Sequence, residues 1–136
     1  MRLLDTNVFL RYLTRDDEEK AQRCFELFQR LKNGDETATT TEAIIAEVVF
    51  VLSSRRLYGL SHEDIRARLL PILGIRGLKL RQKRVYFRAL DIYVAHPALD
   101  FEDALSVATV QVDGVQEIYS YDRDFDRVEG IVRLEP

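Results

Sequence analysis

Short runs typical of β-strands alternate with longer runs typical of α-helices, and this alternation constrains the fold more than any other feature of the chain. The strand-like runs cover 2–5, 36–41, 77–80, 117–122 and 130–134. The helix-like runs begin at Asn7, Arg15, Thr41, Ser61, Gln82 and Asp100, the third continuing to about Gly59. Strands separated by helices usually pair in parallel, so the sequence predicts an α/β sandwich whose first strand is buried.

Length and composition indicate one folded domain spanning residues 1–136. The chain has 136 residues, of which 46% are apolar and 32% are charged, which is typical of a folded protein and not of a disordered one. Its single cysteine, Cys24, excludes an intramolecular disulfide. We expect no signal peptide, since none precedes the first strand, and no apolar run approaches the roughly 20 residues of a membrane span, so a cytoplasmic location is expected.

Charge is unevenly distributed along the chain. Residues 54–90 hold 10 Lys and Arg against 2 Asp and Glu, whereas residues 91–136 hold 3 against 11. Residues 1–53, with 7 against 10, are mildly acidic. A basic third beside an acidic third suits a polyanion bound on one surface and metal cations bound at another.

Three carboxylates are candidates for a functional site: two follow strand-like runs, and the third lies in an apolar run. Asp5 and Asp122 end strand-like runs, and ligands in parallel sheets collect beyond those ends. Glu47 is the only charged residue in Ala43–Leu52, so we expect it to face the interior or a cleft. The alternative for Glu47 is a narrow solvent stripe or a structural pair with an arginine.

Further acids lie at the starts of a helix and a turn, where a structural role is an alternative to a functional one. Asp100 and Asp103 are three residues apart at the start of a helix and therefore share a face. Caps and first turns favour Asp, and turn chemistry alone explains Asp124 after Asp122.

Carboxylates that converge without lysine or arginine repel one another, and hard divalent cations relieve that repulsion. Oxygen ligands favour Mg²⁺ or Mn²⁺. Zinc is not expected, because the only histidines, His62 and His96, have no ligand spacing. No glycine-rich phosphate-binding loop and no serine nucleophile motif is present.

Four motifs together resemble those of the PIN-domain nucleases, and most closely the VapC-type toxins of bacterial and archaeal toxin–antitoxin pairs. The motifs are LLDTNVFLRYL, the lone glutamate in AEVVFVL, DFEDALSVAT and YSYDRDFDRV, in the family's order over nearly the whole chain. The resemblance implies a three-layer α/β/α sandwich with a central parallel sheet and metal-dependent cleavage of RNA. It also implies a homodimer and inhibition by a small VapB-like antitoxin.

The resemblance assigns roles to individual residues. Asp5, Glu47 and Asp103 match the first three acids of the family, and Asp122 is our choice for the fourth, with Asp124 as the alternative. These four would be both catalytic residues and ligands of one or two Mg²⁺ or Mn²⁺ ions. The residues expected to support them are Thr6, Asn7, Asp100 and Asp124. Thr6 and Asn7 would hold Asp5 or a metal-bound water, although Asn7 also fits a helix cap, and Asp100 fits a cap or a water-mediated ligand.

The basic stretch supplies the candidate RNA contacts. They are Arg55, Arg56, Arg81, Lys83 and Arg84, with Arg66, Arg68 and Arg88 in the same stretch. The alternative is that these side chains simply lie on the solvent-exposed outer faces of helices. Tyr58, Tyr86 and Phe87 could stack bases, although a core position is favoured for them.

Two other classes of function compete with a nuclease. Phosphatases and receiver domains with an acid after the first strand need a lysine late in the fold, and the last lysine here is Lys83. The second class is a catalytically silent RNA-binding or antitoxin-docking module. All four acids are present, which favours an active enzyme.

Overall fold

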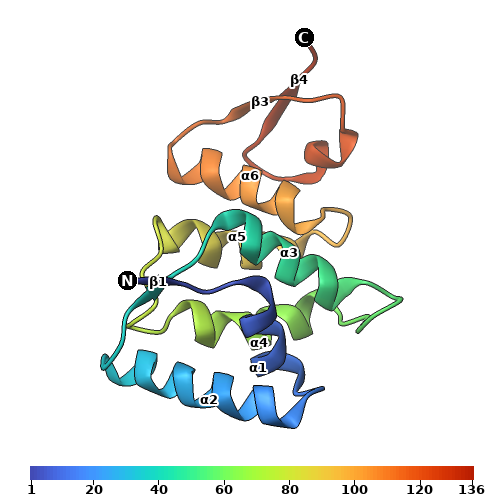
Figure 1. The fold of residues 1–136 in the computed structure, drawn as a ribbon. Coiled ribbons are helices and arrows are strands. Elements are labelled where there is room, and N and C mark those ends of the chain that lie inside the picture. Colours follow the sequence, from blue (N-terminus) through green and yellow to red (C-terminus); the bar gives the residue numbers. More distant parts are fainter. The chain divides into compact units, whose positions relative to one another are not determined.

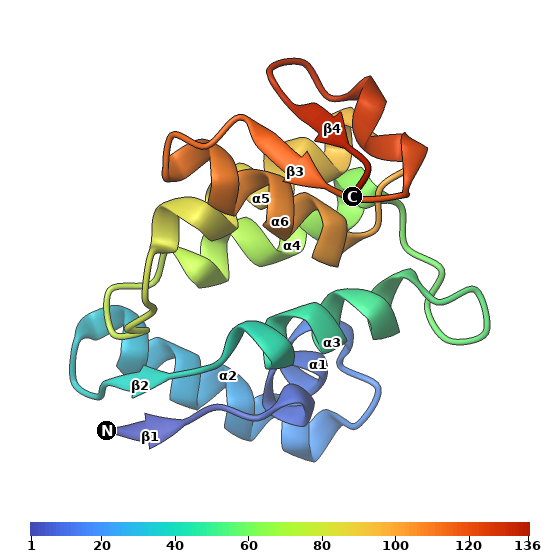
Figure 2. The same cartoon turned by 90° about the horizontal axis from the view of Figure 1, so that it is seen from above.

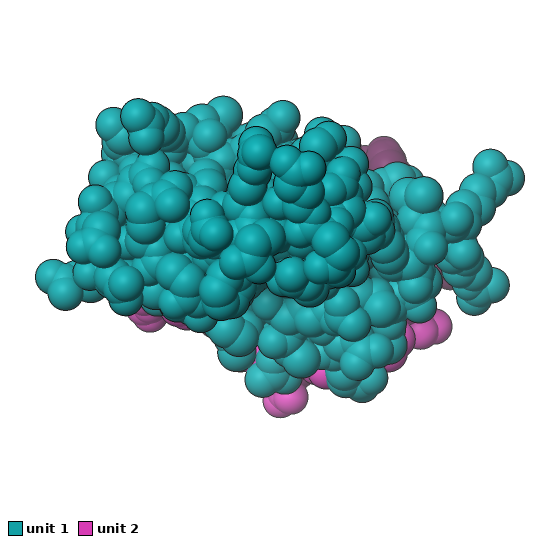
Figure 3. Space-filling model, turned by 60° about the horizontal axis from the view of Figure 1, so that its bottom comes forward, with its two compact units in different colours: residues 1–81 teal, residues 82–136 magenta.

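The computed structural model describes all 136 residues and places helices and strands in the expected order (Figure 1). The chain forms two compact units, residues 1–81 and 82–136, which Figure 3 colours separately. No helix is long and apolar enough to cross a membrane.

The first unit is built on short parallel segments. Strand β1 (Arg2–Leu3) pairs in parallel with β2 (Ala38–Thr39), with Arg2 opposite Ala38, and Figure 2 shows the two side by side. On the other side of β2, the predicted strand at 77–80 is reduced to one parallel bridge between Ala38 and Leu78. The prediction that the first strand is buried is wrong, because Arg2 and Leu3 are exposed and only Leu4 is buried.

Four helices complete the first unit: α1 (Thr6–Thr14), α2 (Glu18–Asn33), α3 (Glu42–Ser53) and α4 (His62–Leu73). Aromatic rings join α1 to α2, with the Phe28 ring 5.9 Å from Phe9 and 4.5 Å from Tyr12 between centroids. Phe9 and Phe28 are fully buried. Burying an aromatic side chain of this size contributes about 2 kcal/mol, so these rings anchor the helix pair.

Side-chain caps explain where most helices begin. The side chains of Asp17, Thr41 and Ser61 each accept a hydrogen bond from a backbone N–H of the first turn of α2, α3 and α4. The predicted continuation of α3 to about Gly59 is wrong. The helix ends at Ser53, and the Gly59 N–H bonds the Ser54 carbonyl in the turn that follows.

Gly77 allows a close approach of three backbone segments in the first unit. The Gly77 N–H donates to the Leu31 carbonyl at the end of α2, over 3.0 Å, and its own carbonyl accepts from the Ala38 N–H of β2. A Cβ at this position would lie 2.4 Å from the Leu31 oxygen and 2.5 Å from the Glu36 oxygen. Only glycine fits this position without displacing the main chain.

The second unit packs two helices and a second pair of parallel strands. It contains α5 (Lys83–Ala95), α6 (Phe101–Val112), β3 (Glu117–Tyr119), the 3₁₀-helix η1 (Arg123–Arg127) and β4 (Val132–Leu134). Helices α5 and α6 pack through Tyr93 and Phe101, whose rings meet edge to face at 5.7 Å. Strand β3 pairs in parallel with β4, Ile118 lying opposite Arg133.

The α/β class predicted from the sequence is confirmed, since helices alternate with parallel strands in both units. The hydrogen-bonded strands form two pairs, β1–β2 and β3–β4. A three-layer sandwich with one central sheet, and a single domain over residues 1–136, stay predictions.

Candidate functional site

Asp5 occupies the N-cap position of α1, but its side chain makes no capping hydrogen bond. The helix begins one residue later, at Thr6, so the prediction that Asn7 caps it is wrong. Asn7 instead lies in the first turn and is exposed. The exposed Asp5 carboxylate therefore has no structural partner in its unit and is available to a ligand.

Thr6 links the start of α1 to Glu47 on α3. The Thr6 hydroxyl is buried and donates to Oε2 of Glu47 over 3.2 Å. Of the two positions predicted for Glu47, the interior is wrong: the buried stripe of α3 consists of Ile45, Val48, Val49 and Leu52, and Glu47 is exposed. The other, facing a cleft, stays a prediction. No ion pair forms with Glu47 within its unit, so nothing there favours the alternative of a structural Glu–Arg pair.

The family resemblance implies that Glu47 is a metal ligand in RNA cleavage, and the hydrogen bond from Thr6 would then orient that ligand. On this expectation Thr6→Val should lower the rate of cleavage about 10- to 100-fold, the usual cost of removing a residue that orients a metal ligand. Thr6→Ser keeps the hydroxyl and should stay close to wild type. Parallel rate measurements with both variants check this. Equal rates for the two would show that the Thr6 hydroxyl does not position Glu47.

In the second unit, three aspartates lie close enough to influence one another. The Asp100 carboxylate caps α6 by accepting from the Asp103 N–H over 2.8 Å. Burial, together with the negative charges of Asp100 and Asp122, raises the pKa of Asp103 to about 6. Asp103 therefore sits in a local excess of negative charge, which is the electrostatic setting of a cation site.

Asp122 and Asp124 have different surroundings. Asp122 begins η1 and accepts from the Asp124 N–H over 2.9 Å, so part of its acceptor capacity is used in a turn. The Asp122 side chain is exposed and close enough to Asp103 to raise its pKa, whereas Asp124 is half-buried. This favours Asp122 as the fourth acid.

The chemistry of these donors fits a hard divalent cation. The candidate ligands are all carboxylate oxygens, and none of Asp5, Glu47, Asp103 and Asp122 forms an ion pair within its own unit. Such donors suit Mg²⁺ or Mn²⁺. No group of three or more His, Cys, Asp or Glu side chains stands at the spacing of a complete metal site.

The predicted RNA contacts are distributed over both units. Arg55 and Arg56 are exposed in the turn after α3, and Arg81 is exposed at the end of the first unit. Lys83 and Arg84 form the first turn of α5 in the second unit.

The three aromatics of the basic stretch differ in exposure. Tyr86 is buried in the core, as favoured from the sequence, and Phe87 is half-buried. Tyr58 is more exposed, and its hydroxyl donates to Asp16. That bond, followed by one from Arg11, lowers the pKa of Asp16. Tyr58 therefore links the turn after α3 to the segment between α1 and α2.

Comparison with known proteins adds to this geometry. The family model described as "PIN domain" matches residues 2–131. The chain belongs to the PIN domain family. Across 128 residues this PIN domain is 28% identical to a protein named VapC ribonuclease from Aquifex aeolicus (strain VF5), an alignment that covers 94% of this chain and 92% of the relative. The match confirms the family resemblance inferred from the four acidic motifs.

Sequence reasoning named Arg84 and Arg88 in the basic stretch but missed Gln111, which lies beside them. A cavity on the second unit brings Arg84 and Arg88 of α5 together with Gln111 of α6. The spacing of four between the arginines was visible in the sequence. Gln111 carries no local signal, because its place beside Arg88 follows from the packing of two helices.

Proposed function

We propose that this PIN domain is a metal-dependent endoribonuclease that hydrolyses RNA phosphodiester bonds and acts as the toxin of a type II toxin–antitoxin pair. The observation that carries the proposal is the set of carboxylates without an ion pair in their own unit, with a raised pKa at Asp103, at the four acidic motifs of the family. The similarity to a protein named VapC ribonuclease supports RNA as the substrate.

We assign the metal ligands to Asp5, Glu47, Asp103 and Asp122. When bound, one or two Mg²⁺ or Mn²⁺ ions supply Lewis acidity and lower the pKa of a coordinated water. Asp5 presents its carboxylate from the N-cap of α1, and Thr6 orients Glu47 through the hydrogen bond described above.

The second unit supplies the remaining assigned groups. Asp103 stands in the first turn of α6, and Asp100 holds the backbone of that turn. Asp122 presents its carboxylate from the start of η1. The four carboxylates are assigned to the cations by the acidic motifs of the family, and no covalent intermediate with a protein side chain is required.

The same proposal covers the architecture and the partners. We assign residues 1–136 to one domain with the three-layer α/β/α sandwich and central parallel sheet that the family resemblance implies. A small VapB-like antitoxin and a second copy of this chain are the proposed protein partners. The similarity to a VapC ribonuclease supports the first, and the family resemblance alone supports the second.

Cleavage should depend strictly on divalent metal. We expect purified protein to cut end-labelled RNA in Mn²⁺ or Mg²⁺, and to lose that activity in EDTA, because neither attacking water nor leaving oxygen is then stabilised. Thermal melting provides a second readout. Metal at about 100 times its Kd should stabilise the fold by about 2.7 kcal/mol.

Each outcome separates the proposal from its alternatives. Cleavage that persists unchanged in EDTA would contradict the metal mechanism. An absence of both cleavage and metal stabilisation would favour the silent RNA-binding or antitoxin-docking module.

A further inference from the structure

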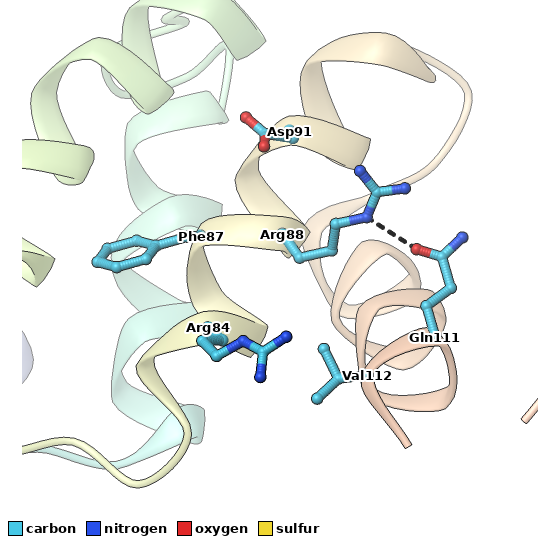
Figure 4. A pocket seen from close by; sticks show the side chains of 6 residues that line it. All are labelled: Arg84, Phe87, Arg88, Asp91, Gln111 and Val112. Carbon is cyan, nitrogen blue, oxygen red and sulfur yellow. Dashed lines mark hydrogen bonds between the residues drawn. The ribbon is translucent and has the colours of Figure 1, made fainter. Parts of the chain in front are cut away.

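A cavity of about 420 Å³ lies on the second unit between α5 and α6 (Figure 4). Its lining consists of Arg84, Phe87, Arg88, Asp91, Gln111 and Val112. The volume falls within the range of about 300–1,000 Å³ found for ligand sites. The proposed ligands of the catalytic metal do not line this cavity.

The two arginines are neighbours on one face of α5. Arg84 and Arg88 are one helical turn apart, and Figure 4 shows both guanidinium groups on the side of α5 that faces Gln111 and Val112. The Arg88 Nε donates to Gln111 Oε1 over 2.9 Å, which leaves its terminal nitrogens unused. Neither guanidinium forms an ion pair within this unit, and the Asp91 carboxylate lies at the far end of the cavity from Arg84 (Figure 4).

The start of α5 adds to this positive charge. Arg84 lies in the first turn, which contains no acidic residue, and Gln82 makes no side-chain cap. Cations at the positive end of a helix, and like charges one turn apart, each destabilise by a few tenths of a kcal/mol or more. A bound anion would remove both costs.

We propose that this cavity binds phosphate groups of the RNA backbone, with Arg84 and Arg88 as donors and Gln111 holding Arg88 in place. The planar guanidinium fork matches phosphate oxygens and binds them in pairs. This inference rests on the proposed function, since RNA is the substrate of that function.

An acidic peptide is the alternative ligand, because a guanidinium fork matches carboxylate as well as phosphate oxygens. Four of the six lining residues are polar or charged, and RNA is preferred because it is the substrate of the proposed function. The remaining two are Val112 and Phe87, and the Phe87 ring points away from the guanidinium groups (Figure 4). The same orientation argues against stacking of a base on Phe87 at this site.

RNA affinity with a salt titration tests the proposal. Fluorescence anisotropy would follow a labelled single-stranded RNA binding to the Asp5→Ala protein, in which cleavage is blocked. We expect Arg84→Gln with Arg88→Gln to weaken binding about tenfold for two unrelated sequences and to lower the salt slope by about 0.7 for each phosphate that is no longer bound. The matched control is Arg76→Gln, which removes an exposed arginine without an ion pair and should stay within about twofold.

Several results would overturn this site. One is the absence of measurable RNA affinity in the parent protein. Another is a double variant that binds RNA as tightly as the Arg76→Gln control. A loss of affinity for a poly-glutamate peptide but not for RNA would assign the cavity to an acidic protein. Stabilisation of the parent by adenosine monophosphate, absent from the double variant while RNA affinity is unchanged, would assign it to a free nucleotide.

Cleavage assays on the otherwise wild-type chain separate this inference from the proposed function. Arginine-dependent RNA binding without metal-dependent cleavage would support the cavity and contradict the nuclease. Metal-dependent cleavage with unchanged RNA binding in the double variant would support the nuclease and contradict the cavity.

Discussion

Asp5→Ala should abolish RNA cleavage with little effect on stability, and Asp17→Ala should do the reverse. Both residues are N-caps, of α1 and α2, yet only the Asp17 side chain caps its helix, by accepting from the Lys20 N–H over 3.1 Å. Loss of that cap costs about 1 kcal/mol, or about 3 °C in melting temperature. Loss of a metal ligand should cost more than the 10- to 100-fold typical of residues that only support one.

Thermal melts and cleavage rates measured on both variants check this contrast. If Asp5→Ala melts several degrees lower and still cuts RNA, Asp5 is a structural cap and the assignment of the first acid fails. Rates for Asp17→Ala that match those of wild type exclude a general effect of removing an acid at a helix start.

Asp103→Asn should abolish cleavage and, in EDTA above pH 6, raise the melting temperature. The folded protein holds a proton on Asp103 up to a pKa of about 6, whereas the ordinary value is 3.8. Between these values the folded state binds more protons than the unfolded state, so stability falls as the pH rises through this window. Above pH 6 the Asp103 carboxylate is ionised in the folded protein and the full loss of stability is present. Asparagine carries no charge and removes this loss.

The expected size of this gain is modest because Asp103 is only half-buried. The full pKa difference corresponds to about 3 kcal/mol, and solvent screening reduces it to about 1 kcal/mol, or about 3 °C. The gain should disappear near pH 4. Glu102→Gln is the control, because it removes a charge from the same turn of α6 at an exposed position. A variant Asp103→Asn that is no more stable than Glu102→Gln at pH 7.5 would contradict the electrostatic argument.

Local chemistry explains which parts of the fold were predictable from sequence. Thr41, Ser61 and Asp100 begin helices because a side-chain oxygen reaches a backbone N–H three residues on, an interaction contained within four residues. The four acidic motifs were equally readable, because their order along the chain matches a family that the later comparison confirmed.

Interactions between distant residues explain what the sequence did not predict. The apolar neighbours of Glu47 indicated a position in the interior or facing a cleft, but the face that α3 buries depends on the elements packed against it. The end of α3 is similar, since Arg55 and Arg56 are good helix formers and carry no stop signal. The Leu60 N–H bonds the Leu52 carbonyl and Tyr58 bonds Asp16, contacts that exist only once the chain has turned back.

The close backbone approach at Gly77 affects how sequence variation among relatives should be interpreted. Any side chain there would collide with the carbonyl oxygens of Leu31 and Glu36, far along the chain from the four acids. Selection for folding alone is enough to hold this position to glycine. An invariant glycine at residue 77 would therefore reflect the packing of the end of α2 against β2. It should not be counted as an active-site residue in a search based on conservation.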